Sequence, residues 1–131
     1  MKRTIGLLTA FIVLIVLVSA CSSYENGRTL TDENSGQTIE MNVGDIFTVE
    51  LEGNPSTGYT WEVAEMDTAL LKQVGETEFE TDNDLVGASG VLILRFEAIG
   101  TGETALNLVY HRPWEEDIPP EETFEVSLVV K

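Results

Sequence analysis

The residue types that most often carry out protein chemistry are scarce in this sequence of 131 residues. It holds one cysteine, Cys21, and one histidine, His111. A serine triad would need His111 to take a proton from Ser56 or Ser89, and no nucleophile motif surrounds either serine. One histidine and one cysteine are too few for a zinc site of the usual kind. We therefore predict no catalytic residue, no cofactor and no metal site, and a protein that is not an enzyme.

An acidic segment is the remaining candidate for ion binding. Glu115, Glu116 and Asp117 could bind Ca²⁺ weakly, but EF-hand spacing is absent and a solvated acidic loop accounts for the same residues. The whole chain is acidic, with 23 acidic and 7 basic residues and a net charge of −16. Such an excess of negative charge disfavours nucleic acid and anionic membrane surfaces as partners.

Three segments combine turn residues with side chains suited to contact another molecule. Residues 53–59 contain an Asn, a Pro and two Gly, which predict a stiff turn that projects small side chains. Residues 87–90 begin and end with glycines, which allow the backbone of a partner to approach closely. In Arg112-Pro113-Trp114, the proline stiffens the presentation of two side-chain types that are enriched in interface hot spots. Taken singly, each segment also fits a less specific role: an ordinary turn, a hairpin connection and, for Trp114, a cap on the core.

Apolar and polar residues alternate in the sequence that separates these three segments, which predicts that strands position them. One apolar face per strand is typical of antiparallel sheets that pack on a core, to which we assign Tyr59 and Trp61. Seven short strands in about 95 residues favour an all-β, immunoglobulin-like antiparallel β-sandwich. The strands are expected at residues 38–42, 46–52, 59–65, 72–80, 90–98, 103–111 and 123–130, with one helical turn possible at 67–73.

The order of the strands predicts where the three segments lie. Each turn of an antiparallel array reverses the chain, so that alternate connections fall at the same end of the sandwich. Residues 53–59, 87–90 and 112–114 would then share one pole, while short, ordinary connections such as residues 43–45 would occupy the other. The sequence therefore predicts a binding surface made of three adjacent loops.

In this order, the three segments resemble the loop motifs of the chagasin family of cysteine peptidase inhibitors. That family shows Asn-Pro-Thr-Thr-Gly-Tyr/Phe, Gly-x-Gly-Gly and Arg-Pro-Trp/Phe. This chain departs from the pattern at Ser56, which replaces a Thr, and at Ser89, which replaces a Gly. If the position of Ser89 requires a positive φ, the serine strains its loop.

The resemblance implies an immunoglobulin-like sandwich that inhibits papain-like cysteine peptidases by pushing three loops into the active-site cleft. Thr57 and Gly58 would lie nearest the catalytic thiol, residues 87–90 would line one side of the cleft, and Arg112 and Trp114 would grip the other. The residues so implied in peptidase binding are Asn54, Pro55, Ser56, Thr57, Gly58, Gly87, Ala88, Ser89, Gly90, Arg112, Pro113 and Trp114. The alternative is a surface binding module whose loops recognise a glycan or an envelope protein. We expect a monomer in either case.

The first twenty residues have the features of a secretory signal peptide. Lys2 and Arg3 precede an apolar run that is shorter than a transmembrane helix requires. Residues 17–21, Leu-Val-Ser-Ala-Cys, resemble the lipobox of prokaryotic lipoproteins, which implies removal of residues 1–20 and lipidation of Cys21. A plain signal peptide followed by a free cysteine is the alternative.

These features predict the domain organisation. We expect residues 1–20 to be a lipoprotein signal peptide, residues 21–37 a lipidated flexible spacer and residues 38–131 the inhibitor domain. Loss of two basic residues with the leader changes the net charge from −16 to −18. The mature protein would be lipid-anchored to a membrane in the cell envelope, outside the cytoplasm.

Overall fold

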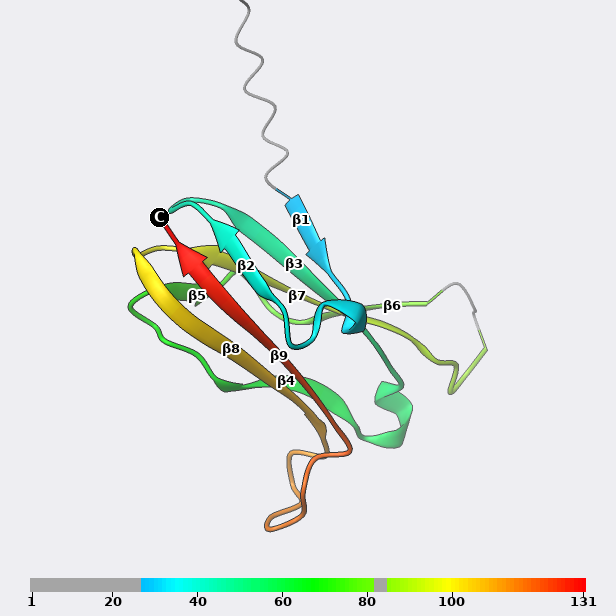
Figure 1. Ribbon diagram of the computed structural model, residues 1–131. Coiled ribbons are helices and arrows are strands. Elements are labelled where there is room, and N and C mark those ends of the chain that lie inside the picture. The colour runs from blue at the N-terminus through cyan, green and yellow to red at the C-terminus, as the bar shows by residue number, and fades with distance from the viewer. Residues whose placement is uncertain (1–26, 82–84) are drawn as a thin grey trace, which may run out of the picture.

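The computed structural model describes residues 27–81 and 85–131, which form two packed β-sheets (Figure 1). The elements are β1 (Gly27–Leu30), η1 (Asp32–Asn34), β2 (Thr38–Met41), β3 (Ile46–Gly53), η2 (Pro55–Thr57), β4 (Thr60–Glu65), β5 (Leu71–Gln73), β6 (Glu78–Glu80), β7 (Gly90–Ala98), β8 (Gly102–His111) and β9 (Glu122–Val130). Both η elements are single turns of 3₁₀-helix, and these described ranges contain no α-helix. The prediction of an all-β sandwich is confirmed.

Each sheet is built around a pair of long antiparallel strands. One sheet has the order β1-β3-β7-β5, with β6 also paired to β7, and the other has the order β2-β9-β8-β4. The pairs β3–β7, β8–β9 and β4–β8 are antiparallel, as alternating strands joined by turns require. The two N-terminal strands instead pair in parallel, β1 with β3 and β2 with β9. The N-terminal segment therefore adds one edge strand to each sheet.

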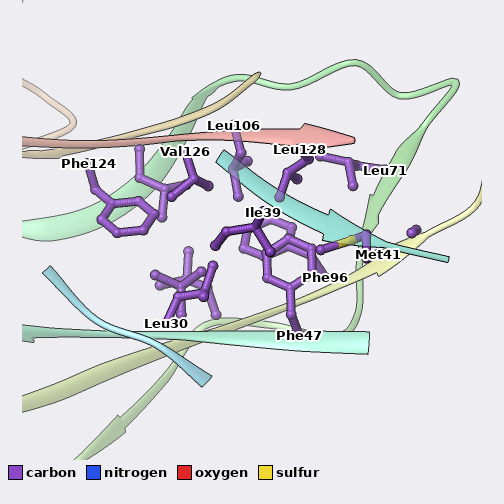
Figure 2. Close-up of a cluster of buried hydrophobic side chains, with 14 of the residues drawn as sticks. Leu30, Ile39, Met41, Phe47, Leu71, Phe96, Leu106, Phe124, Val126 and Leu128 are labelled. Carbon is purple, nitrogen blue, oxygen red and sulfur yellow. The ribbon is translucent and has the colours of Figure 1, made fainter. Parts of the chain in front are cut away.

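The core between the sheets is apolar, and no polar or charged residue of the described ranges is buried. Figure 2 shows Ile39 and Met41 of β2 in one cluster with Phe47 and Phe96. The rings of Phe47 and Phe96 face each other across the β3–β7 pair and stack with their centroids 5.4 Å apart. Burying each large apolar side chain contributes roughly 1.5–3 kcal/mol, so that this cluster is the main force that holds the two sheets together.

The predicted strand at residues 72–80 is wrong in one respect, because two short strands occupy it. β5 pairs with the end of β7, and β6 pairs with its beginning. Between them Gly75 adopts a φ of +73°, which interrupts the ladder, so that the chain leaves β7 and returns to it. The other six predicted strands match the observed ones to within about one residue at each end. The helical turn expected near residue 67 is also present, since the amide of Leu71 donates to the carbonyl of Asp67 at 2.9 Å.

The expectation of a flexible spacer over residues 21–37 is wrong for residues 27–37. β1 pairs with β3 over four residues, and Leu30 is buried with 2% of its surface exposed. The turn that follows is tied by the amide of Thr31, which donates to Oδ1 of Asn34 at 2.9 Å. Sequence periodicity could not reveal this strand, because Leu30 is its only large apolar residue and the pairing is made by the backbone.

The N-terminal end of β1 lies at the end of the sandwich where β3 begins, since Gly27 pairs with Ile46. The predicted signal peptide, Cys21 and the first part of the predicted spacer lie outside the described residues. Within residues 27–81 and 85–131, no helix has the length and apolar character needed to cross a membrane.

Candidate functional site

The three segments singled out in the sequence meet at one end of the sandwich, which we call the loop pole. It is formed by the β3–β4 loop (residues 54–59), the described part of the β6–β7 loop (residues 81 and 85–89) and the β8–β9 loop (residues 112–121). Register places these loops together, because Gly53 pairs with Gly90 and Thr60 pairs with His111. Figure 1 shows them on the side away from the C-terminus. The predicted juxtaposition is confirmed.

The β3–β4 loop is a capped turn that its own residues hold in shape. Asn54 accepts the backbone N–H of Ser56 on its side-chain oxygen at 3.1 Å, which caps η2. The hydroxyl of Thr57 donates to the carbonyl of Asn54 at 2.6 Å. Gly58 then adopts a φ of +87°, and its amide donates to the carbonyl of Pro55 at 2.9 Å. The stiff turn predicted from Asn, Pro and Gly is therefore present, with Thr57 exposed at its tip.

The side chain of Asn54 also joins this turn to the β6–β7 loop. Its Nδ2 donates to the carbonyl of Gly87 at 2.9 Å, while Gly87 itself has a φ of +81°. Ser89 does not have a positive φ, so the strain that such a φ would cause is absent. Asp117 is the one non-glycine residue of the described ranges with a positive φ. A glycine is required instead at Gly90, because a Cβ there would lie 2.2 Å from the carbonyl oxygen of Glu80. Ser89 thus leaves the backbone of the loop unstrained.

The side chain of Arg112 joins the β8–β9 loop to the first turn. Its Nε donates to the carbonyl of Thr57 at 3.1 Å, and its guanidinium carbon lies 4.5 Å from the centre of the Tyr59 ring. Its Nη1 is 3.0 Å from Oε1 of Glu115. Glu115 is well placed for this contact because its amide closes the turn around Pro113 by donating to the carbonyl of Arg112 at 3.0 Å. The guanidinium expected to grip a partner is therefore engaged within the protein.

Trp114 projects from the loop pole with 67% of its surface exposed, so that the alternative in which it caps the core is wrong. One edge of its indole ring rests on Gly58, where an added Cβ would lie 2.1 Å from Cη2 of the indole. Two features therefore require a glycine at position 58: the positive φ of its backbone and the close approach of the Trp114 ring. The contact makes Trp114 part of the same body as the β3–β4 loop.

A column of stacked aromatic rings connects the loop pole to the core. Trp61 is buried with 3% exposure and stacks on Tyr110, and Tyr110 stacks in turn on Tyr59, with 5.2 Å between ring centroids in each pair. Tyr59 itself is only partly buried, and the guanidinium of Arg112 stacks on its ring. The prediction that Tyr59 belongs to the core is therefore wrong. Tyr59 lies at the rim because β4 begins one residue later and the sheet no longer covers it.

Sequence reasoning missed the part played by Tyr110. Its hydroxyl accepts the backbone N–H of Asn54 at 2.9 Å and so anchors the start of the β3–β4 loop to β8. The alternation of β8 indicates an inward-facing ring, but not that its hydroxyl reaches the β3–β4 loop. The sequence likewise predicts Glu115 as part of a solvated acidic loop, whereas the structure pairs it with Arg112. The i,i+3 spacing to Arg112 across a proline was the available signal for this ion pair.

Polar groups elsewhere at the pole are arranged as structural pairs. Nε2 of His111 lies 2.8 Å from Oε2 of Glu62, and the hydroxyl of Ser56 donates to Oδ1 of Asn54. Ser56 and His111 therefore do not form the serine–histidine pair that a triad needs. Among residues 27–81 and 85–131, no group of three or more His, Cys, Asp or Glu side chains is placed to hold a metal ion.

A β-sandwich that presents three cross-braced loops at one pole has the architecture of a protein inhibitor or binding module. The family described as chagasin family peptidase inhibitor I42 matches residues 40–128. Chagasin of Trypanosoma cruzi is 30% identical over 103 residues, covering 76% of this chain and 94% of chagasin. Amoebiasin-2 of Entamoeba histolytica is 28% identical over 111 residues, covering 84% of this chain and 90% of the relative. This chain belongs to the chagasin family, whose members are inhibitors and not enzymes.

Solved structures agree with this assignment. The solution structure of amebosin superposes with a TM-score of 0.68 at 30% identity, covering 80% of this chain and 98% of that one. The cysteine protease inhibitor EhICP2 of Entamoeba histolytica superposes with a TM-score of 0.70 at 24% identity, covering 80% of this chain and 95% of that one, and supports the fold alone. The structure of PbICP-C in complex with falcipain-2 has a TM-score of 0.59 at 17% identity, covering 80% of this chain and all of that one, and supports the fold alone.

Proposed function

We propose that this protein inhibits papain-like cysteine peptidases by filling the active-site cleft with the three loops of the loop pole. The observation that carries the proposal is that side-chain hydrogen bonds join the loops into one exposed body. Asn54 binds the carbonyl of Gly87, and Arg112 binds the carbonyl of Thr57. Family membership supports inhibition, whereas nothing in the comparisons favours a module for a glycan or an envelope protein.

The shape of the β3–β4 turn explains how it could block an active site without being cut. Papain-like enzymes hold a thiolate and an imidazolium at the floor of a cleft and cleave a peptide that lies extended across them. Residues 55–57 form a 3₁₀ turn and Gly58 has a φ of +87°, which lies outside the extended region. The tip therefore brings the Thr57 and Gly58 backbone to the thiolate in a conformation that the enzyme cannot process.

The two flanking loops would hold the tip in place. The glycines of residues 87–90 would let the peptidase backbone approach on one side, and Trp114 would pack on the other. Trp114 suits this role because the residue is 67% exposed, yet one edge of its ring rests on Gly58. A loop body that is already braced loses little conformational entropy on binding, which favours tight inhibition.

The location of the protein is a separate part of the proposal. The lipobox-like segment before Cys21 supports lipidation of that residue and tethering to a membrane outside the cytoplasm. A Cys21→Ser variant should then leave the membrane fraction, and the mass of the mature wild-type protein should include acyl chains on Cys21. A wild-type protein that carries no acyl mass and fractionates with the soluble proteins would contradict this part alone.

Inhibition is tested by titrating papain and cathepsin L with the purified protein while cleavage of a fluorogenic peptide is followed. We expect a linear loss of activity that ends at one inhibitor per enzyme. A serine peptidase such as trypsin is the control and should be unaffected. No loss of activity at micromolar inhibitor, with both cysteine peptidases, would contradict the proposed function and leave the binding module as the remaining candidate.

A further inference from the structure

The guanidinium of Arg112 has its contacts within the inhibitor, although its position in the loop pole suggested a contact with the peptidase. Nε donates to the carbonyl of Thr57, one face covers the ring of Tyr59, and Nη1 pairs with Glu115. Only 37% of the Arg112 side chain is exposed, and 22% of the Glu115 side chain. A planar guanidinium can make all three contacts at once, because its donors point in fixed directions and its face stacks on an aromatic ring.

One of these three contacts, the hydrogen bond from Nε, reaches Thr57 at the tip of the β3–β4 loop. On one side of Thr57, its amide donates to the carbonyl of Asn54 at 3.1 Å and its hydroxyl donates to the same carbonyl at 2.6 Å. On the other side, the carbonyl of Thr57 accepts from Arg112 at 3.1 Å. The peptide that joins Thr57 to Gly58 is therefore fixed at its carbonyl by a residue that lies 55 positions further along the chain.

We propose that Arg112 is a positioning residue, which acts through the Thr57 carbonyl to keep the tip in a conformation that the peptidase cannot cleave. This inference rests on the proposed function. Without the Arg112 brace, the loop keeps the contacts within its own turn, the hydrogen bonds that Asn54 makes with Gly87 and Tyr110, and the packing of Trp114 on Gly58, but none of these bonds the Thr57 carbonyl. The Thr57–Gly58 peptide can then relax toward the extended form that a cysteine peptidase accepts. Loss of Arg112 therefore turns an inhibitor into a slow substrate.

A direct ionic contact between Arg112 and the peptidase is the competing explanation, and it makes a different prediction for lysine. A lysine keeps the positive charge, and would preserve much of an ionic contact, but it lacks the guanidinium fork and the planar face. We therefore expect Arg112→Lys to behave like Arg112→Ala. Glu115→Gln removes the ion pair and leaves the hydrogen bond to Thr57, so its effect should be smaller than that of either Arg112 variant.

The control is Arg95→Ala, because Arg95 resembles Arg112 in exposure and pairing but lies on β7, away from the loop pole. Its side chain is 38% exposed and its Nη1 lies 3.0 Å from Oε2 of Glu78. Arg95 pairs with Thr48 in the middle of β3. Arg95→Ala therefore removes the same charge and one ion pair as Arg112→Ala, but leaves the contacts of the loop pole unchanged. Inhibition by this variant should equal that of the wild type.

The experiment uses the full chain in a non-ionic detergent with papain, and records both the inhibition constant and the intact mass of the inhibitor over several hours. Hydrogen bonds to a charged group contribute about 1.5–3 kcal/mol, so Arg112→Ala should weaken inhibition by roughly 10- to 100-fold. Its mass spectrum should show a new cleavage within residues 56–59, and inhibition should fade with time. Wild type and Arg95→Ala should stay intact and inhibit stably.

A measurement without peptidase separates this inference from the proposed function. Amide ¹⁵N relaxation should report ordered Thr57 and Gly58 backbones in the wild type, and lower order parameters at both residues in Arg112→Ala and Arg112→Lys. The amides of Gly44 and Thr101, at the other end of the sandwich, should not change. If the tip stays equally ordered in the variants, or if the variants inhibit like the wild type and remain uncut, the positioning role is refuted even though the wild type inhibits. A third outcome would also refute the positioning role. If Arg112→Ala inhibits weakly while Arg112→Lys inhibits like the wild type and stays uncut, the direct ionic contact is favoured instead.

Discussion

The two ends of the sandwich are built in different ways. At the end opposite the loop pole, the connections are short and backbone atoms tie them together. The amide of Gly44 donates to the carbonyl of Ala98 at 2.8 Å, and that of Ile99 donates to the carbonyl of Leu70 at 2.8 Å. At the loop pole, side chains make the links between loops, chiefly those of Asn54, Tyr110 and Arg112.

The difference shows which parts of the molecule can change without loss of the fold. Backbone hydrogen bonds form with almost any sequence, so the end opposite the loop pole tolerates substitution as long as the turns close. Hydrogen bonds from side chains need particular residues. The arrangement of the loops therefore depends on a few side chains, whereas the packing of the core does not depend on them. We therefore expect substitutions at the loop pole to reduce inhibition more than stability, and matched substitutions at the other end to reduce stability alone.

The largest effect is expected for Gly58→Ala. The new Cβ would meet the indole of Trp114 at 2.1 Å, and the φ of +87° is unfavourable for alanine. Trp114 must move away and the tip must distort, so inhibition of papain should fall by about 100-fold or more. The matched control is Gly44→Ala, where φ is +95° and nothing lies within 4 Å of the new Cβ. It should lose about 1–2 kcal/mol of stability in urea and inhibit normally. Equal inhibition by the two variants would show that the ends do not differ in this way.

Trp114→Ala should have the next largest effect. An exposed aromatic side chain at a hot spot is worth about 2 kcal/mol or more, so the inhibition constant should rise roughly 30-fold. The free energy of unfolding should change by less than about 0.5 kcal/mol, because the residue is 67% exposed. Ile99→Ala is the counterpart at the other end, where Ile99 is 42% exposed. Surface plasmon resonance should find a faster dissociation rate for Trp114→Ala and no change for Ile99→Ala.

Asn54→Ala should reduce both inhibition and stability. The variant loses the cap of η2, which is worth about 0.5–2 kcal/mol, together with the hydrogen bond to Gly87. We expect inhibition to weaken about 10-fold and thermal denaturation to begin earlier. Asp45→Ala loses a comparable bond, from the amide of Asn42 at 2.8 Å, and should be destabilised without weaker inhibition. Unchanged inhibition by Asn54→Ala would mean that the cap and the bond to Gly87 do not matter for binding.

The smallest effect is expected for Thr57→Ala, although Thr57 lies at the tip. Its hydroxyl bonds within the turn, to the carbonyl of Asn54. Its backbone amide also bonds that carbonyl, and its own carbonyl accepts from Arg112. The shape of the tip should persist, so the inhibition constant should change by about threefold or less. A loss as large as that of Trp114→Ala would show instead that the hydroxyl binds the peptidase.

The strands could be predicted because one face of each is apolar and the other polar. This alternation located β3, β7, β8 and β9 closely, and the reversal of the chain at each turn placed the three loops at one pole. It failed for β1, which has one large apolar residue, Leu30, and for the gap at Gly75, where a glycine breaks a strand that appears continuous in the sequence. Both errors arise where backbone geometry outweighs side-chain pattern.

The loop motifs identified which residues matter at the site but not what each contacts. Motif position suggested that Arg112 faces outward, whereas the structure turns it onto Thr57, Tyr59 and Glu115. The hydroxyl of Tyr110 was equally hidden, since its bond to Asn54 joins residues that are 56 positions apart. A sequence gives the type of each side chain, whereas its direction depends on packing between strands that are distant in the chain.

The two ends of the described chain lie at the same end of the sandwich. Gly27 begins β1 beside the start of β3, and the amide of Lys131 donates to the carbonyl of Met41 at 2.9 Å, as β9 finishes far from the loops (Figure 1). A group joined to the chain at Gly27 or at Lys131 is thus attached at the end of the sandwich opposite the loop pole. Immobilisation through either of these two points leaves the loops facing the solution, where a diffusing enzyme can reach them.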